Sequence, residues 1–128
     1  GFALNPLAVE GQHEGSISGG VGHTIYEHCV EEDGQTLNPN FTGYGLPTVF
    51  DVPEVMVSLS IETLDPVGAF GAKESGEGTQ VSTIPAIVNA VHNAVGVWIT
   101  DLPVTPEKVL KALGQKKAEE RARAEVSR

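Results

Sequence analysis

The stretch that decides the fold is "GAKESGEGTQVSTIPAIVNAVHNAVG", residues 71–96. Its second half repeats apolar residues at helical spacing, and these are Ile84, Ile87, Val88, Val91, Ala94 and Val95. Ser82 or Thr83 can cap the start of such a helix, and Gly96 suits its end. The pattern therefore predicts a helix over residues 83–95, with a glycine-rich turn directly in front of it.

This turn places a glutamate, Glu77, among glycines. Gly71 and Gly76 have the spacing of the phosphate-binding GxxxxGK[ST] loop, but Glu77 stands where that loop needs its lysine. A carboxylate there would repel phosphate, which excludes a phosphate loop. Glycine neighbours let the carboxylate approach a substrate or cofactor as a general base. From spacing alone, a solvated surface carboxylate is an equally good interpretation, and Glu74 is a competing candidate.

Charge is unevenly distributed along the chain, which has 128 residues, 40% hydrophobic residues and a formal net charge of −9. Residues 1–107 hold fourteen acidic residues and a single basic residue, Lys73. An acidic body of this kind does not suit nucleic acid or an anionic membrane as a partner. The length allows one domain with a modest core.

Signals for metal ligands and for membrane insertion are weak. The single cysteine, Cys29, excludes an internal disulfide and any iron–sulfur or zinc site made of cysteines alone. The four histidines lack the HxxxH and HExxH spacings, so we predict no metal ligand from the protein. No apolar run reaches the roughly 20 residues that cross a bilayer, so we expect a cytoplasmic protein without a membrane span.

Residues 12–28 predict a second helix. The apolar residues at helical spacing are Ile17, Val21 and Ile25. A parallel stripe of small residues is formed by Gly15, Gly19 and Gly22. Because each interior glycine costs a helix about 1 kcal/mol, such a stripe suits the close approach of another backbone or of a bulky ligand. An irregular glycine loop is the alternative.

Three further patterns predict strands and turns. Asp33-Gly34 is typical of a hairpin turn. Residues 55–64, "VMVSLSIETL", alternate apolar and other residues, which predicts a strand with one buried face. Residues 97–100 predict a short strand.

The end of the chain predicts a small helix followed by a tail. Thr105 and Pro106 suit the start of a helix over residues 107–113, and Gly114 suits its end. The remaining residues are helix-prone but lack an apolar face, which indicates a solvated stretch.

Three segments, in this order, carry a resemblance to a known family. They are "VEGQHEGSISGGVGHTIYEH" (9–28), "GAKESGEG" followed by "TIPAIVNAVHNAVGV" (71–78 and 83–97), and "DLPVTPEKVLKAL" (101–113). Together they resemble the C-terminal part of the molybdopterin-binding large subunit of the xanthine oxidase family. That family includes xanthine and aldehyde oxidoreductases, aerobic carbon monoxide dehydrogenases and 4-hydroxybenzoyl-CoA reductases.

The resemblance implies an α+β fold, the C-terminal portion of the molybdenum-cofactor-binding domain of a molybdenum hydroxylase. Residues 1–113 would form this segment, and residues 114–128 a charged, solvated tail. Most of the large subunit is absent from this chain, which begins at Gly1. We therefore expect a split subunit, a processed piece or a fragment that needs its partner.

The resemblance also implies roles for three residues. Glu77 matches the glutamate that lies beside molybdenum and acts as the base, without being a metal ligand. Gln12 matches a position that hydrogen-bonds the pterin cofactor, and Gly76 belongs to the same cofactor-binding turn. Lys73 matches a lysine common in this motif but receives no role. Ser75 and Glu74 replace smaller or apolar residues and bring the motif closest to the 4-hydroxybenzoyl-CoA reductase branch.

The implied function is the catalytic component of a multi-subunit molybdenum hydroxylase acting on an electron-poor carbon of a small molecule. Its cofactor would be molybdenum–molybdopterin, in a dinucleotide form, shared with the rest of the large subunit. Electrons would pass to iron–sulfur clusters and FAD on partner subunits. The alternatives are a reductive dehydroxylation like that of 4-hydroxybenzoyl-CoA reductase, and a non-catalytic assembly subunit of such a complex.

Overall fold

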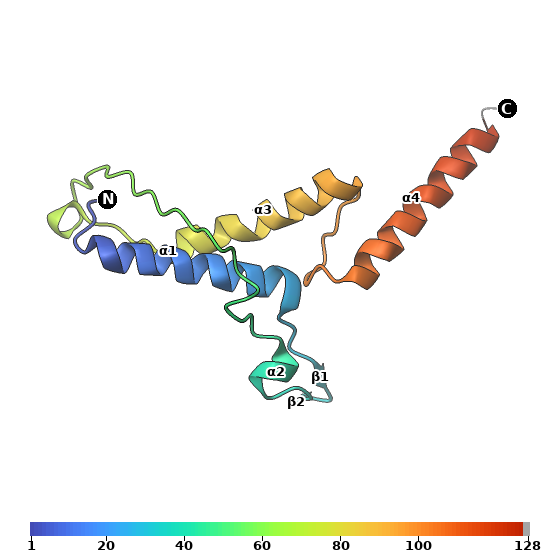
Figure 1. Cartoon of the computed structure of the whole chain (residues 1–128), viewed down its shortest axis with the longest axis horizontal. Coiled ribbons are helices and arrows are strands. Elements are labelled where there is room, and N and C mark those ends of the chain that lie inside the picture. The colour runs from blue at the N-terminus through green and yellow to red at the C-terminus, as the bar shows by residue number, and fades with distance from the viewer. Residues whose placement is uncertain (127–128) are drawn as a thin grey trace.

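Two long helices that lie side by side form the centre of the computed structural model, which describes residues 1–126 (Figure 1). Helix α4 extends away from this pair, and a small hairpin with the short helix α2 projects on another side. The elements, in chain order, are α1 (Pro6–Val21), the π-helix η1 (Gly22–Tyr26), β1 (Glu31–Glu32), β2 (Gln35–Thr36), α2 (Phe41–Tyr44), the 3₁₀ turn η2 (Ala69–Gly71), α3 (Glu77–Val95) and α4 (Pro106–Val126).

Helix α1 confirms the helical interpretation of residues 12–28, with different bounds. It begins earlier, where the Asn5 side chain accepts a hydrogen bond from the backbone N–H of Ala8 (3.1 Å) and Pro6 occupies the first turn. It continues at Gly22 into the π-helix η1, in which the Glu27 N–H donates to the Gly22 carbonyl over 2.9 Å. The irregular-loop alternative is wrong.

Helix α3 confirms the predicted helix and its end. Gly96 adopts a left-handed conformation (φ 69°), and its N–H donates to the His92 carbonyl over 2.7 Å. The start differs, because the helix begins at Glu77, six residues before the predicted position. Pro85 therefore lies inside the helix and not in its first turn.

The predicted hairpin turn is confirmed. Strands β1 and β2 pair antiparallel, and Asp33 (φ 50°) with Gly34 (φ 76°) connects them. Positive φ at both central residues is typical of the type I′ turn, which explains the Asp-Gly sequence.

The predicted strand over residues 55–64 is absent, since β1–β2 is the only ladder within residues 1–126. The segment is extended, but its apolar side chains face solvent: Val55 is 75% exposed, Val57 73%, Leu59 82% and Ile61 85%. A strand exists only where a neighbour completes its hydrogen-bond ladder. Residues 97–100 also form no strand, although Val97 and Ile99 are buried.

The small hydrophobic core lies where the end of α3 meets the start of α4. Its buried residues are Val97, Ile99 and Val104. Partly buried residues of the two helices pack around them, and these include Val88, Val91, Val95, Val109 and Leu113. The core therefore stands apart from the glycine-rich turn, at the opposite end of α3.

Helix α4 passes through Gly114, so the helix end predicted there is wrong. A side chain at Gly114 would meet nothing within 4 Å, and helix propensity of the following residues carries the helix on to Val126. Most side chains after this glycine are exposed, as expected for a solvated segment. Residues 127–128 of the predicted tail lie outside the described residues, and the division at 113/114 stays a prediction.

None of the helices within residues 1–126 is both long enough and apolar enough to cross a membrane.

Candidate functional site

The glycine-rich turn brings Glu77 to the first position of α3. The Glu77 side chain is exposed, and its backbone N–H donates to the Glu74 carboxylate. Glu74 therefore closes the turn, in the way that an acidic side chain satisfies a free N–H at the start of a helix. The competing carboxylate has a structural partner, whereas Glu77 projects from the helix.

Helix α1 meets this turn directly. Ser16 donates a hydrogen bond from its hydroxyl to the Gly76 carbonyl over 2.9 Å. A Cβ added to Gly76 would lie 3.0 Å from Oε1 of Gln12. Gly76 thus leaves the space that the exposed Gln12 amide occupies. The three predicted site residues, Gln12, Gly76 and Glu77, lie where the start of α3 meets the middle of α1.

Sequence reasoning missed Ser16, and it misplaced the glycine contact between the helices. A Cβ at Gly20 would lie 2.5 Å from Cβ of Thr83 in α3, so the closest approach is at Gly20. Of the predicted stripe, Gly19 has an ordinary contact, 3.5 Å to Gln80 Nε2, and Gly15 has nothing within 4 Å. Gly19 and Gly20 are neighbours in the sequence. The register in which α1 packs on α3 decides which of them makes the close contact.

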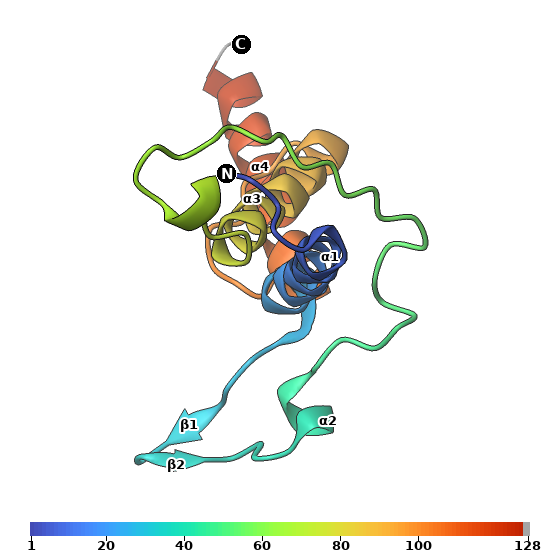
Figure 2. The same cartoon turned by 90° about the vertical axis from the view of Figure 1, so that its left-hand side faces the viewer.

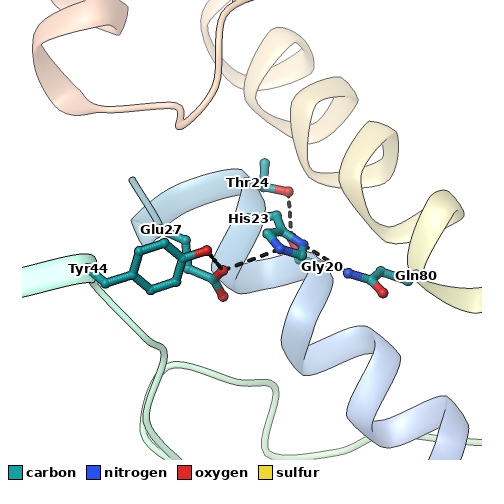
Figure 3. Close-up of polar contacts among 6 residues, drawn as sticks. All are labelled: Gly20, His23, Thr24, Glu27, Tyr44 and Gln80. Carbon is teal, nitrogen blue, oxygen red and sulfur yellow. Dashed lines mark hydrogen bonds and ion pairs between the residues drawn. The ribbon is translucent and has the colours of Figure 1, made fainter. Parts of the chain in front are cut away.

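A chain of polar contacts runs beside the glycine contact (Figure 3). Gln80 Nε2 of α3 lies 2.9 Å from His23 Nδ1, and His23 Nε2 lies 3.3 Å from a carboxylate oxygen of Glu27. The Tyr44 hydroxyl donates to the same oxygen over 2.7 Å. This hydrogen bond is the main cause of a raised pKa of Tyr44. No sequence pattern predicted the π-helix that carries His23 and precedes Glu27.

Thr24 of the π-helix η1 connects α1 with the segment that precedes α4. It is fully buried, its hydroxyl donates to the Gly20 carbonyl over 2.6 Å, and its own carbonyl accepts from the Val104 N–H over 2.7 Å. The second bond joins the helix pair to the segment that carries the core.

Lys73, the single cation of residues 1–107, lines a small pocket together with Gln12, and it pairs with Asp65. Its Nζ atom lies 4.0 Å from Oδ2 of Asp65, and its side chain is exposed. A hydrogen bond from the Val67 N–H is the main cause of a lowered pKa of Asp65, with a smaller contribution from Lys73. Within residues 1–126, no three His, Cys, Asp or Glu side chains are grouped to hold a metal ion.

Comparison with known proteins agrees with this fold. Residues 1–53 match the family model of the molybdopterin cofactor-binding domain. Two curated relatives are the "Putative xanthine dehydrogenase molybdenum-binding subunit XdhA" of Escherichia coli, 38% identical over 85% of this chain, and the "Aldehyde oxidoreductase" of Megalodesulfovibrio gigas, 36% identical over 88%. The chain spans 15% of the length of the first and 12% of the length of the second.

A solved structure shares the arrangement of elements. Quinoline 2-oxidoreductase from Pseudomonas putida superimposes with a TM-score of 0.76 and 33% sequence identity, over 87% of this chain and 14% of its own. Fold and sequence are thus similar to a small part of the molybdenum-binding subunits of xanthine dehydrogenases and of aldehyde oxidoreductases. The first 53 residues are similar to the molybdopterin cofactor-binding domain.

Proposed function

We propose that this chain completes the molybdenum site of a hydroxylase, with Glu77 as the catalytic base and with Gln12 and Gly76 as cofactor contacts. One observation carries the proposal. The Ser16 hydroxyl holds the Gly76 carbonyl against α1, and this contact brings the Gln12 amide of α1 next to the turn from which Glu77 starts α3. A carboxylate on a helix is held more firmly than one on a surface loop.

The residues at this end fit one edge of a pterin cofactor. The Gln12 amide offers both a donor and an acceptor to a heterocycle. The glycine at position 76 keeps the backbone bare, since a Cβ there would lie 3.0 Å from Oε1 of Gln12 and would crowd that amide. The chain supplies no cluster of metal ligands within residues 1–126, which suits a metal held by its own organic cofactor.

The molybdenum–molybdopterin group, when bound, supplies the two-electron redox chemistry. Glu77 contributes proton transfer, because its side chain is a carboxylate that projects from the first residue of α3. Glu74 instead positions Glu77, since its carboxylate accepts the Glu77 backbone N–H. This division of roles favours Glu77 over the neighbouring carboxylate.

The proposed substrate is a small molecule with an electron-poor carbon, in an aromatic or heterocyclic ring or in an aldehyde. The names of the xanthine and quinoline relatives agree with a nitrogen heterocycle, and that of the aldehyde oxidoreductase agrees with an aldehyde. The reductive alternative acts on an aromatic CoA thioester, and the Glu74-Ser75 sequence of the turn favours it.

The proposed first partner is the remaining part of the large subunit. The extended residues 55–64 support it, because their apolar side chains are exposed and lack the ladder that their alternation predicts. The same proposal includes a dinucleotide form of the cofactor. It also includes an iron–sulfur subunit and a flavin subunit as further partners, and a cytoplasmic location for the complex.

The test is Glu77→Gln in the assembled complex. Turnover should fall by about 100-fold or more, the usual contribution of a general base, while molybdenum content stays at the wild-type level. Glu14→Gln is the matched control, since it makes the same change on the exposed surface of α1 and should leave turnover within two-fold. Glu77→Gln turnover within a few-fold of wild type would refute the proposal.

Metal analysis separates the catalytic role from the non-catalytic alternative. The purified complex should contain about one molybdenum per large subunit if this chain completes the site. A complex that assembles with this chain but contains no molybdenum would favour the assembly role.

A further inference from the structure

The polar contacts that run from α3 to α2 have no role in the proposed function of Glu77. Figure 3 shows His23 between Gln80 of α3 and Glu27, with Tyr44 of α2 on the far side of the carboxylate. The contacts thus cross from one helix of the pair, through the π-helix, to the small projecting unit of α2.

Hydrogen-bonding chemistry assigns a direction to each contact. A carboxylate only accepts, so the His23 Nε2 atom at 3.3 Å from Glu27 carries the hydrogen. In the neutral ring, Nδ1 is then the acceptor, and the Gln80 amide donates to it over 2.9 Å. Each donor in the series meets an acceptor.

Glu27 is a fixed anchor for this series. Its side chain is only 7% exposed, it accepts a hydrogen bond from Tyr44, and it lies 3.3 Å from His23 Nε2. A Cβ at Gly22 would overlap the Glu27 carboxylate, so a side chain at this position would displace the carboxylate. The π-helix sets this register through the Glu27 N–H bond to the Gly22 carbonyl, and π-helical turns often mark functional positions.

Along its first two turns, α3 is held at three successive levels. Ser16 binds the Gly76 carbonyl, His23 binds the Gln80 side chain, and Gly20 packs against Thr83. Gln80 lies three residues after Glu77, so the two side chains occupy neighbouring parts of the helix surface. Loss of the His23 contact would remove one of these three restraints on the turns of α3 that carry Glu77.

We propose that His23, anchored by Glu27, is a positioning residue that fixes the orientation of α3 and thereby of Glu77. The inference rests on the proposed function of Glu77 and adds to it a contact series outside the cofactor-binding turn.

The first test is His23→Leu in the assembled complex with its cofactor. We expect kcat to fall by about 10-fold, because a small displacement of a catalytic group is costly, with KM and molybdenum content within two-fold of wild type. His23→Gln should restore most of kcat, since its amide can donate to Glu27 and accept from Gln80. The control is His28→Leu, the same change at an exposed histidine outside the series, and it should stay within two-fold.

A second readout does not depend on activity. Backbone amides of residues 77–83 should exchange hydrogen faster in His23→Leu than in wild type and should regain protection in His23→Gln. If His23→Leu fails to assemble, Gln80→Met provides the alternative, since it removes the bond from the α3 side with a side chain of similar length. Unchanged exchange in these variants would overturn the inference.

A double-variant comparison distinguishes the two proposals. In a Glu77→Gln background, His23→Leu should cause no further loss of kcat, because a positioning residue acts only through the group that it positions. An equal loss in both backgrounds overturns the role of His23 and leaves that of Glu77 intact. If Glu77→Gln alone leaves turnover unchanged, the proposed function fails, and the inference fails with it.

Discussion

The α1–α3 pair consists of two helices packed side by side, whereas residues 55–64 run outside this pair without regular structure (Figure 2). The helices meet through small and polar residues, with Gly20 against Thr83 and Ser16 on the Gly76 carbonyl. The extended segment carries larger apolar residues that remain in solvent, and it is tied to α1 by the His13 contact with the Ser58 hydroxyl at 2.6 Å.

This difference shows that the contact between α1 and the start of α3 does not depend on large apolar side chains. The helix pair approaches closely because glycine leaves room and hydroxyls supply hydrogen bonds, and both features need only the two helices. The extended segment has the pattern of a half-buried strand, but a strand needs a neighbour that the described residues do not supply.

The largest expected effect on stability comes from a matched pair of substitutions in α1. Gly20→Ala should lower the free energy of unfolding by about 2 kcal/mol, because its Cβ would lie 2.5 Å from that of Thr83 and the helices must separate. Gly15→Ala should raise it by up to about 1 kcal/mol, since nothing lies within 4 Å and alanine favours helix.

Urea unfolding followed by circular dichroism measures both variants. The same change from glycine to alanine should lower the free energy of unfolding at position 20 and raise it at position 15, if α1 packs closely on α3 at Gly20. Equal shifts of the two variants would mean that α1 and α3 do not meet at Gly20.

A smaller effect is expected in the extended segment. Ile61→Asp should change the chain's own free energy of unfolding by less than about 0.5 kcal/mol, because the side chain is 85% exposed. The same variant should weaken association with the remaining large subunit, measured by co-purification, whereas Ile61→Val should retain it. A marked loss of stability in the chain alone would place Ile61 in an internal contact.

The smallest effect concerns pH and the turn that joins the two regions. The pKa of Asp65 is lowered from its ordinary value of 3.8, mainly by the Val67 N–H, so its stabilising contribution is present above that value and disappears as pH falls through the lowered pKa. Asp65→Asn should therefore flatten the acid limb of the stability profile between about pH 4 and pH 2. Unfolding midpoints at a series of pH values test this, and an unchanged limb would contradict it.

Sequence reasoning was most successful where a feature depends on neighbours along the chain. The Gly96 end of α3 and the Asp33-Gly34 hairpin follow from backbone conformations that glycine favours. It failed where a local signal was overridden, as at Gly114, which α4 passes through. For the candidate site, the sequence supplied Gln12, Gly76 and Glu77 through a family resemblance, and their roles remain a proposal.

The sequence by itself determined that α1 and α3 are helices, that Gly96 ends α3 and that Asp33-Gly34 forms a hairpin turn, because these depend on spacing and backbone preference over a few residues. Only the tertiary structure decided that Gly20 is the contact glycine, that Ser16 holds the Gly76 carbonyl, and that His23 reaches Gln80. Each of these depends on the register between α1 and α3. Residues more than 55 positions apart share no local pattern that sets such a register, so packing alone sets it.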